Sequence, residues 1–480
     1  MNTQLDCAYT YFLITIPQQD TTIMGDIFRS KAANAAFEDL NMGAGSLRVE
    51  EVRPKNSIPA VLAASTSIQF EWSSPGRYIA LSESYLEISF TCAASAPGQT
   101  THKALNEDQL TSTGEAAATN GSNHIDMVLQ KHWPDLAINA IRHSISGTQV
   151  ESTNEPALQR SFMETAQQQG YSEAAATAFC AGTFESRQAQ LSTGTKHTIA
   201  WRPPLGLWQN TTLIPGSGVH RLDIDTKDIS QYIMTVFEAS LTGAGIAADG
   251  FTLTNFVQIG DTTAATGTQQ FMFGIESIVL RCATISPQDG RLPPASMMLE
   301  TRTVEIQRLP AGQQPAVDRQ ILIPGSTFKI GVMHQQDDDY KPDNRRAHPS
   351  LREDTKLVNQ SLHVDGVQLP APEYVFSLSN GARDHMRPYI DFLTANGSLT
   401  SENATASSGC SVSFEQYADR PLYLARLVSA PGLAKDLLVR CRFSGNTANK
   451  SVIVGSYHTK AVAMTFDSSG NISSVQVTGL

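Results

Sequence analysis

Ile145-Ser-Gly-Thr-Gln-Val150 has a counterpart 219 residues later, Val364-Asp-Gly-Val-Gln-Leu369. Both stretches read apolar-x-Gly-x-Gln-apolar, both end a strand-like run, and a helical pattern follows each of them. Glycine permits the tight turn that reverses a strand. Six positions can also match by chance. The offset is nearly half of the 480 residues, however, so the pair predicts a duplicated β unit.

Alternation of apolar and polar residues, the pattern of a half-buried strand, surrounds both stretches. In Ser67-Ile-Gln-Phe-Glu-Trp72 it places Ile68, Phe70 and Trp72 on one face. Further predicted strands are Tyr85–Phe90, Ala140–Ile145, Thr198–Trp201, Arg221–Ile224, Phe271–Phe273, Ile278–Cys282, Thr303–Ile306, Phe328–Val332, Leu362–Val364, Leu437–Cys441, Val452–Val454 and Ala461–Met464. Short strands with turn-rich breaks are typical of a sandwich or barrel, so the fold class is all-β.

Helical patterns are few and short. The sequence predicts helices over Pro156–Phe179, with a break at Gly170, over Asp384–Leu393 and over Thr22–Leu40. Two long polar loops, Ala93–Asn123 and Gln335–Lys356, are expected at the surface.

Three prolines within Ser286–Ser296 indicate a stiff connector between two β units. We therefore expect an N-terminal arm over residues 1–45, a first unit over 46–285, the connector over 286–296, and a second unit with a C-terminal tail over 297–480. The arm contains an apolar run, Tyr9–Ile16, that a lone subunit covers poorly.

Charge and hydropathy exclude several classes of protein. The chain has 35 basic and 46 acidic residues, for a net charge of −11, which argues against a coat that neutralises nucleic acid itself or binds it sequence-specifically. No run of 18 apolar residues predicts a membrane span. Tyr9–Ile16 is short for a signal peptide and no basic residue precedes Arg29, so we expect a protein that is made inside the cell and not secreted.

No motif predicts catalysis, a cofactor or a metal centre, and we expect none of these sites. The six cysteines form no C-x-x-C pair, and we expect buried thiols. Gly243–Ala248 matches a loose dinucleotide motif, but a β-like run follows it where a helix is required. Asp337–Asp339 with Asp343 lacks calcium-loop spacing and indicates a solvated acidic loop, with a weak metal site as the alternative. The histidines, among them His124, His132 and His143, are not at ligand spacing.

Several segments resemble, in order, the major capsid proteins of polinton-like viruses, virophages and their double jelly-roll relatives. The segments are Arg77–Ile88 (RYIALSESYLEI), Ile141–Val150, Gln159–Thr165, Pro203–Trp208 followed by Leu213–Pro215 and Arg221–Ile224, and Gln320–Val332. None of them is specific alone, and residues 1–45 match no family segment.

The resemblance implies two tandem eight-stranded jelly-roll sandwiches with long loop insertions and a few short helices. It also implies a structural subunit that is not an enzyme. Such a chain forms homotrimers, the pseudo-hexameric capsomers of an icosahedral shell. Its partners would be itself, neighbouring capsomers, and penton and minor capsid proteins, and its location the virion.

Two other classes of protein remain open from the residues alone. A glycan-binding or glycan-cleaving β protein needs an aromatic-lined cleft or a carboxylate pair, and the chain has four tryptophans (Trp72, Trp133, Trp201, Trp208). A minor capsid or spike protein usually has a repeat of 20–50 residues, and none is visible.

Overall fold

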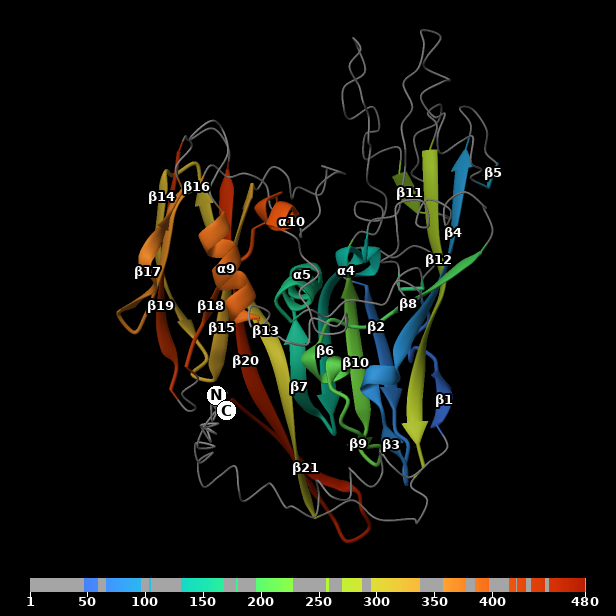
Figure 1. The fold of residues 1–480 in the computed structure, drawn as a ribbon. Coiled ribbons are helices and arrows are strands. Elements are labelled where there is room, and N and C mark those ends of the chain that lie inside the picture. The colour runs from blue at the N-terminus through green and yellow to red at the C-terminus, as the bar shows by residue number, and fades with distance from the viewer. Residues whose placement is uncertain are drawn as a thin grey trace, which may run out of the picture.

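The computed structural model has four β-sheets and a few short helices, and the predicted all-β fold class is confirmed (Figure 1). It describes residues 47–58, 66–95, 103–104, 131–167, 178–179, 196–227, 256–258, 270–286, 295–336, 357–376, 385–396, 414–419, 421–428, 433–444 and 449–479. The predicted arm, the helix over Thr22–Leu40 and most of the connector and of the two long loops lie outside these residues.

Twelve strands build the two sheets of a first unit: β1 (Leu47–Val52), β2 (Ser67–Trp72), β3 (Tyr78–Ile79), β4 (Tyr85–Ser95), β5 (Lys103–Ala104), β6 (Ile138–Ile145), β7 (Thr148–Thr153), β8 (His197–Trp201), β9 (Ile214–Pro215), β10 (His220–Thr226), β11 (Phe256–Gln258) and β12 (Gln270–Ile285). One sheet contains β1, β12, β4 and β8 with the short strands β3, β5, β9 and β11. The other has the order β2-β10-β6-β7.

Nine strands build the two sheets of a second unit: β13 (Ser296–Gly312), β14 (Ala316–Ile323), β15 (Thr327–Gln336), β16 (Leu357–Val364), β17 (Val367–Val375), β18 (Tyr423–Arg426), β19 (Lys435–Phe443), β20 (Lys450–Phe466) and β21 (Ile472–Gly479). One sheet has the order β13-β20-β15-β18 with β21 beside β20, and the other β14-β19-β16-β17.

Both units have the same topology. Without the short strands β3, β5, β9 and β11 and without β21, each unit has eight strands, which we number 1 to 8 in chain order. In both units one sheet then has the strand order 1-8-3-6 and the other the order 2-7-4-5. Two four-stranded sheets with these long antiparallel crossovers are a jelly roll. The predicted pair of eight-stranded jelly rolls is therefore what the sheets form.

The two repeated stretches occupy the same place in both units. Each is the hairpin between the fourth and fifth strands, with Ile145 opposite Thr148 in one and Val364 opposite Val367 in the other. Both central residues of each turn have positive φ, 48° and 83° at Ser146-Gly147 and 48° and 81° at Asp365-Gly366. Positive φ at both central residues is typical of a type I′ turn, whose backbone twist matches the twist of the two flanking strands. Glycine adopts this conformation without strain. The duplication predicted from the echo is confirmed by topology.

The predicted strands are found, with two differences in length. Phe271–Phe273 and Ile278–Cys282 belong to one strand, β12, which continues through a bulge near Glu276. Val452–Val454 and Ala461–Met464 belong to one strand of 17 residues, β20, which pairs with β13 along its length. It also pairs with β15 over its first half and β21 over its second. Residues 450–458 of β20 are all buried, so both faces of the strand are covered there and the alternation is lost.

Five short α-helices and one 3-10 helix, η1 (Leu81–Glu83), complete the described residues. The α-helices are α4 (Trp133–Ala137), α5 (Pro156–Gln167), α8 (Gly206–Gln209), α9 (Met386–Ala395) and α10 (Phe414–Asp419). The helix predicted to start at Pro156 ends at Gln167 in the described residues, and Phe179 lies in a turn. The helix predicted over Asp384–Leu393 is α9, two residues further on.

The two units share their hydrophobic cores. Met297 and Leu299 of β13 and Met464 and Phe466 of β20 belong to the core cluster of the first unit. In return, Leu158, Phe162 and Met163 of α5 pack with residues of β13, β15 and β20. Figure 1 shows α5 between the sheets of the two units.

Phe162 is fully buried where α5 meets the second unit. It packs over Gly331 and Gly455, which are opposite each other on β15 and β20. A Cβ at Gly331 would lie 3.0 Å from the ring, and one at Gly455 would overlap it. The hydroxyl of Tyr457 donates to the Phe162 carbonyl at 2.8 Å. Two glycines side by side thus leave a socket that one aromatic ring fills.

We expect Phe162→Ala to lower the free energy of unfolding by about 3–5 kcal/mol, because the emptied socket becomes a cavity. Gly455→Ala should cost about 1–3 kcal/mol, because the methyl group overlaps the ring. In the double variant the methyl has room, so the combined loss should be smaller than the sum. Chemical denaturation of the four proteins measures this coupling. If the loss in the free energy of unfolding of the double variant equals the sum of the two single losses, the ring does not pack on the glycines as described.

Candidate assembly surface

The sequence motifs considered for chemistry form no site in the described residues. Gly243–Ala248, Asp337–Asp339 and Asp343 lie outside them, as does His124. Within the described ranges no group of three His, Cys, Asp or Glu side chains is placed to hold a metal ion. Of the six cysteines, Cys282 and Cys441 are described as free and buried. Burial raises the pKa of the Cys282 thiol to about 12. Among the same ranges, no helix is long and apolar enough to cross a membrane.

All four tryptophans are in the interior. Trp72, Trp133, Trp201 and Trp208 are each less than a tenth exposed. A glycan platform requires an aromatic face that a sugar can reach, so these residues cannot provide one. The tryptophans therefore do not support an aromatic glycan platform, which is one of the two features that the glycan-binding alternative needs.

Two of the predicted lone histidines belong to a buried aromatic cluster in the first unit. Trp208 Nε1 donates to His143 Nδ1 at 3.3 Å, and His143 Nε2 lies 3.4 Å from His220 Nδ1. Trp72 stacks on both imidazole rings. Burial lowers the pKa of His143 well below its usual value, helped by the neighbouring His220, and it lowers the pKa of His220 to about 4. Both rings are neutral core groups at pH 7.

Ion pairs at α4 and β8 fix α5 to the first unit. Arg160 of α5 binds both carboxylate oxygens of buried Asp135, and Trp201 Nε1 donates to Asp135 Oδ1 at 2.8 Å. His132 Nε2 lies 2.8 Å from Glu164 of the same helix. Burial alone would raise the pKa of Glu164, but the hydrogen bond from His132 and the charges of Lys131 and Arg160 hold it at about 2.

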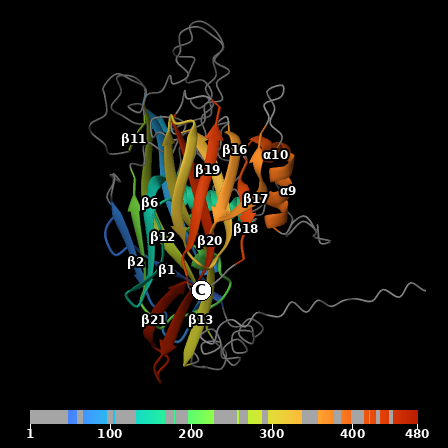
Figure 2. The same ribbon diagram turned by 90° about the vertical axis from the view of Figure 1, so that its left-hand side faces the viewer.

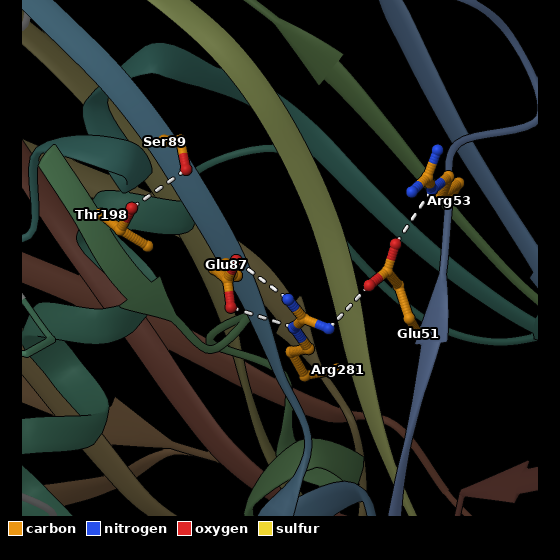
Figure 3. A network of polar contacts seen from close by, with 6 residues as sticks. All are labelled: Glu51, Arg53, Glu87, Ser89, Thr198 and Arg281. Atoms are coloured by element: carbon orange, nitrogen blue, oxygen red, sulfur yellow. Dashed lines mark hydrogen bonds and ion pairs between the residues drawn. The ribbon is translucent and has the colours of Figure 1, made fainter. Parts of the chain in front are cut away.

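The outer face of the first unit's larger sheet is polar (Figure 3). Arg281 of β12 binds both oxygens of Glu87 on β4, at 2.9 and 3.1 Å, and Glu51 on β1 at 2.9 Å. The Ser89 and Thr198 hydroxyls lie 3.0 Å apart on the neighbouring strands β4 and β8. Hydrogen bonds from Arg53 lower the pKa of Glu51. The network therefore pairs opposite charges across the three neighbouring strands β1, β12 and β4.

Helix α9 covers the open side of the second sandwich, beside the edge strands β17 and β18 (Figure 2). Arg387 donates to the Pro372 carbonyl at 2.7 Å, and the Tyr374 hydroxyl donates to Asp391 at 2.7 Å. Burial, together with the bond to Asp391, raises the pKa of Tyr374. A cavity of about 180 Å³ lies between this helix and the two strands.

Edge strand β17 carries two prolines, Pro370 and Pro372. Proline has no N–H to donate, so Pro370 and Pro372 disfavour the addition of a further strand to this part of the edge.

Large exposed apolar side chains occur on both units. On the second unit they are Val367, Val375, Met386, Ile390, Val428 and Leu433, which lie on β17 and α9 and between β18 and β19. On the first unit they include Leu47 and Val49 of β1. We call the first group, from β17 to Leu433, the α9 side, and Leu47 with Val49 the β1 side. The sequence analysis predicted neither group, because a few apolar residues that are exposed form no periodic pattern that separates them from core residues.

The buried histidine pair makes stability depend on pH. In the unfolded chain a histidine gains a proton below about pH 6.5, whereas folded His220 resists protonation down to about pH 4. The unfolded state then binds more protons, so the free energy of unfolding should fall as the pH falls through this window, by about 1.4 kcal/mol per pH unit for each such group. His220→Gln should flatten the slope between pH 6 and 4.5, measured by denaturation, while His363→Gln on the partly exposed β16 should not. An unchanged slope for His220→Gln would contradict this account.

Comparison with known proteins supports the fold. No family model and no curated protein matches the chain. Among solved structures, the mavirus major capsid protein is similar with a TM-score of 0.51 at 9% identity, covering 90% of both chains. A chain of the Sputnik virophage, in a cryo-EM structure, is similar with a TM-score of 0.52 at 11% identity, covering 91% of this chain and 89% of that one. The chain therefore has the double jelly-roll fold of virophage capsid proteins.

Proposed function

We propose that this chain is a viral major capsid protein, a structural subunit without enzymatic activity. One observation carries the proposal: this chain has two jelly rolls with identical strand order, and it is similar to the mavirus major capsid protein over 90% of both chains. The buried tryptophans and the buried pair His143 and His220 support a structural role, because they stabilise the first sandwich.

Three copies of such a chain form a homotrimer with six jelly rolls, a pseudo-hexameric capsomer that tiles a flat facet of an icosahedral shell. Closed symmetry uses the same patches on every copy, so one subunit type covers a large area. The ion pairs of Arg281 keep opposite charges together on the first unit, and the prolines of β17 disfavour strand addition at that edge.

The partners in this proposal are further copies in the trimer, neighbouring capsomers, and penton and minor capsid proteins. The chain is made and assembled inside the host cell and ends up in the virion. With a net charge of −11 the chain does not neutralise the genome with its own charge.

Expression of the whole chain tests the proposal. We expect a solution mass of about three chain masses of 51.9 kDa each. Negative-stain images should show a hexagonal outline, because six similar units surround one axis. A protein that stays monomeric at high concentration and never forms particles with its co-expressed partners would overturn the proposal.

We further propose residues 1–45 as an arm that contacts a neighbouring subunit or a minor protein at the inner face of the shell. The support is the apolar run Tyr9–Ile16, which lies outside both sandwiches in sequence. Removing residues 2–42 should leave a soluble trimer with unchanged near-ultraviolet circular dichroism, while shells fail to close or become fragile. Equally stable shells from the truncated chain would show that the arm has no such role.

A further inference from the structure

We propose that a cavity between the two units is a binding site for a small, neutral polyhydroxylated molecule, such as a monosaccharide or a sugar alcohol. The cavity has a volume of about 380 Å³. Its first wall is the end of β7 with the start of α5, and its second wall is formed by β13 and β20 (Figure 1). None of its lining residues belongs to the α9 side or to the β1 side. Such a ligand site is independent of the proposed capsid function.

The cavity has an exposed polar rim and a buried polar floor. Asn154 and Glu305 are exposed at the rim. On the floor, Gln159 and His458 are each 1% exposed and Thr303 is 3% exposed. The volume falls within the range of about 300–1,000 Å³ that is typical of small-molecule sites. The two units together thus form a pocket that a small solute can enter from one side.

Two side chains of the floor have polar atoms that nothing satisfies. Neither Gln159 Nε2 nor His458 Nε2 has a hydrogen-bond partner among the described residues. A buried polar group without a partner destabilises the folded state, so folded proteins satisfy nearly all such groups with protein, water or ligand atoms. These two atoms therefore indicate that the cavity has an occupant.

The hydrogen-bond roles of the two atoms are opposite. His458 Nδ1 lies 3.1 Å from the Ser456 carbonyl, and because a carbonyl only accepts, Nδ1 carries the proton. Burial lowers the pKa of His458, so the ring is neutral at pH 7 and its Nε2 is an acceptor. Gln159 Nε2 belongs to an amide NH₂ group and is a donor. The occupant must donate to the histidine and accept from the glutamine, and a hydroxyl group does both.

The charges of the lining favour a neutral occupant. Glu155 and Glu305 are acidic and Lys460 is basic. The two carboxylates disfavour an anion, whereas Lys460 and the N–H groups of Gln159 disfavour a bare cation. Within the described ranges, no three side chains of His, Cys, Asp or Glu are placed to hold a metal ion.

The remaining lining matches a molecule that has several hydroxyl groups. Ser152, Thr153 and Thr303 have hydroxyls that both donate and accept, and Val304 and Ile306 are the apolar residues of the lining. Separate water molecules each lose mobility when they are ordered. The hydroxyl groups of a polyol are already joined to one carbon frame, so fewer independent motions are lost. A sugar ring also presents C–H groups, which suit the apolar part of the lining.

Titration of the full chain tests the site. The probes are D-galactose, D-mannose, N-acetyl-D-glucosamine and myo-inositol, each measured by calorimetry and by saturation-transfer NMR. We expect at least one probe to bind at one site per chain and to raise the melting temperature, because a ligand that contacts both units binds only the folded chain. Sodium sulfate and magnesium chloride at the same concentration should not compete with it. If no probe binds, the cavity holds water only, and the inference is overturned while the capsid function stands.

Substitutions on the floor locate the bound probe. Gln159→Met and His458→Phe each remove one of the two polar atoms with little change in volume, and each should weaken binding about tenfold. Gln476→Met is the matched control, because Gln476 is exposed on β21 outside the lining, and its variant should bind as wild type does. Equal binding by all four proteins would place the probe elsewhere and overturn the inference.

Thr303→Val decides the case if either floor variant does not fold. This change removes one buried hydroxyl of the lining and keeps the shape of the side chain. The variant should bind the same probe more weakly than wild type, with an unchanged far-ultraviolet circular dichroism spectrum. Binding as tight as that of wild type would show that the cavity is not the site.

Discussion

The structure depends on one aromatic ring lying on two glycines. Phe162 belongs to a helix that is tied to the first sandwich by the Arg160–Asp135 ion pair, yet its ring is buried on the outer face of the second. That face can accept the ring only because Gly331 and Gly455 are opposite each other and have no side chains, so the ring packs directly on the backbone of the two strands. The cost of two glycines in strand interiors is offset by the close packing that they permit. The position of each unit relative to the other follows from this contact.

The alternation of apolar residues and the paired turns predicted much of this fold. Ile68, Phe70 and Trp72 point into the core, as the period of two requires. The turns at Gly147 and Gly366 were predictable because a primed hairpin turn imposes its own residue types on the chain. The helix at Pro156 was likewise predictable from its local pattern.

What the sequence did not reveal depends on residues far apart in the chain. The role of α5 comes from glycines about 170 and 290 residues downstream, and a local window does not contain that pairing. Strand β21 was missed because polar residues are frequent in Ile472–Gly479. The candidate assembly surface was missed because Val428 and Leu433 look ordinary in sequence, and only their exposure separates them from core residues.

The shared core also sets an order of events during synthesis. Met464 and Phe466 complete the core of the first unit but are about 180 residues downstream of its last strand. The first sandwich therefore leaves the ribosome with part of its apolar core exposed to solvent, and this part stays exposed until β20 has been translated. Contacts of such long sequence separation form slowly, and a nascent chain with an open core is prone to aggregation. Translation speed and chaperone access over residues 286–466 should thus govern how much of this protein reaches its native state.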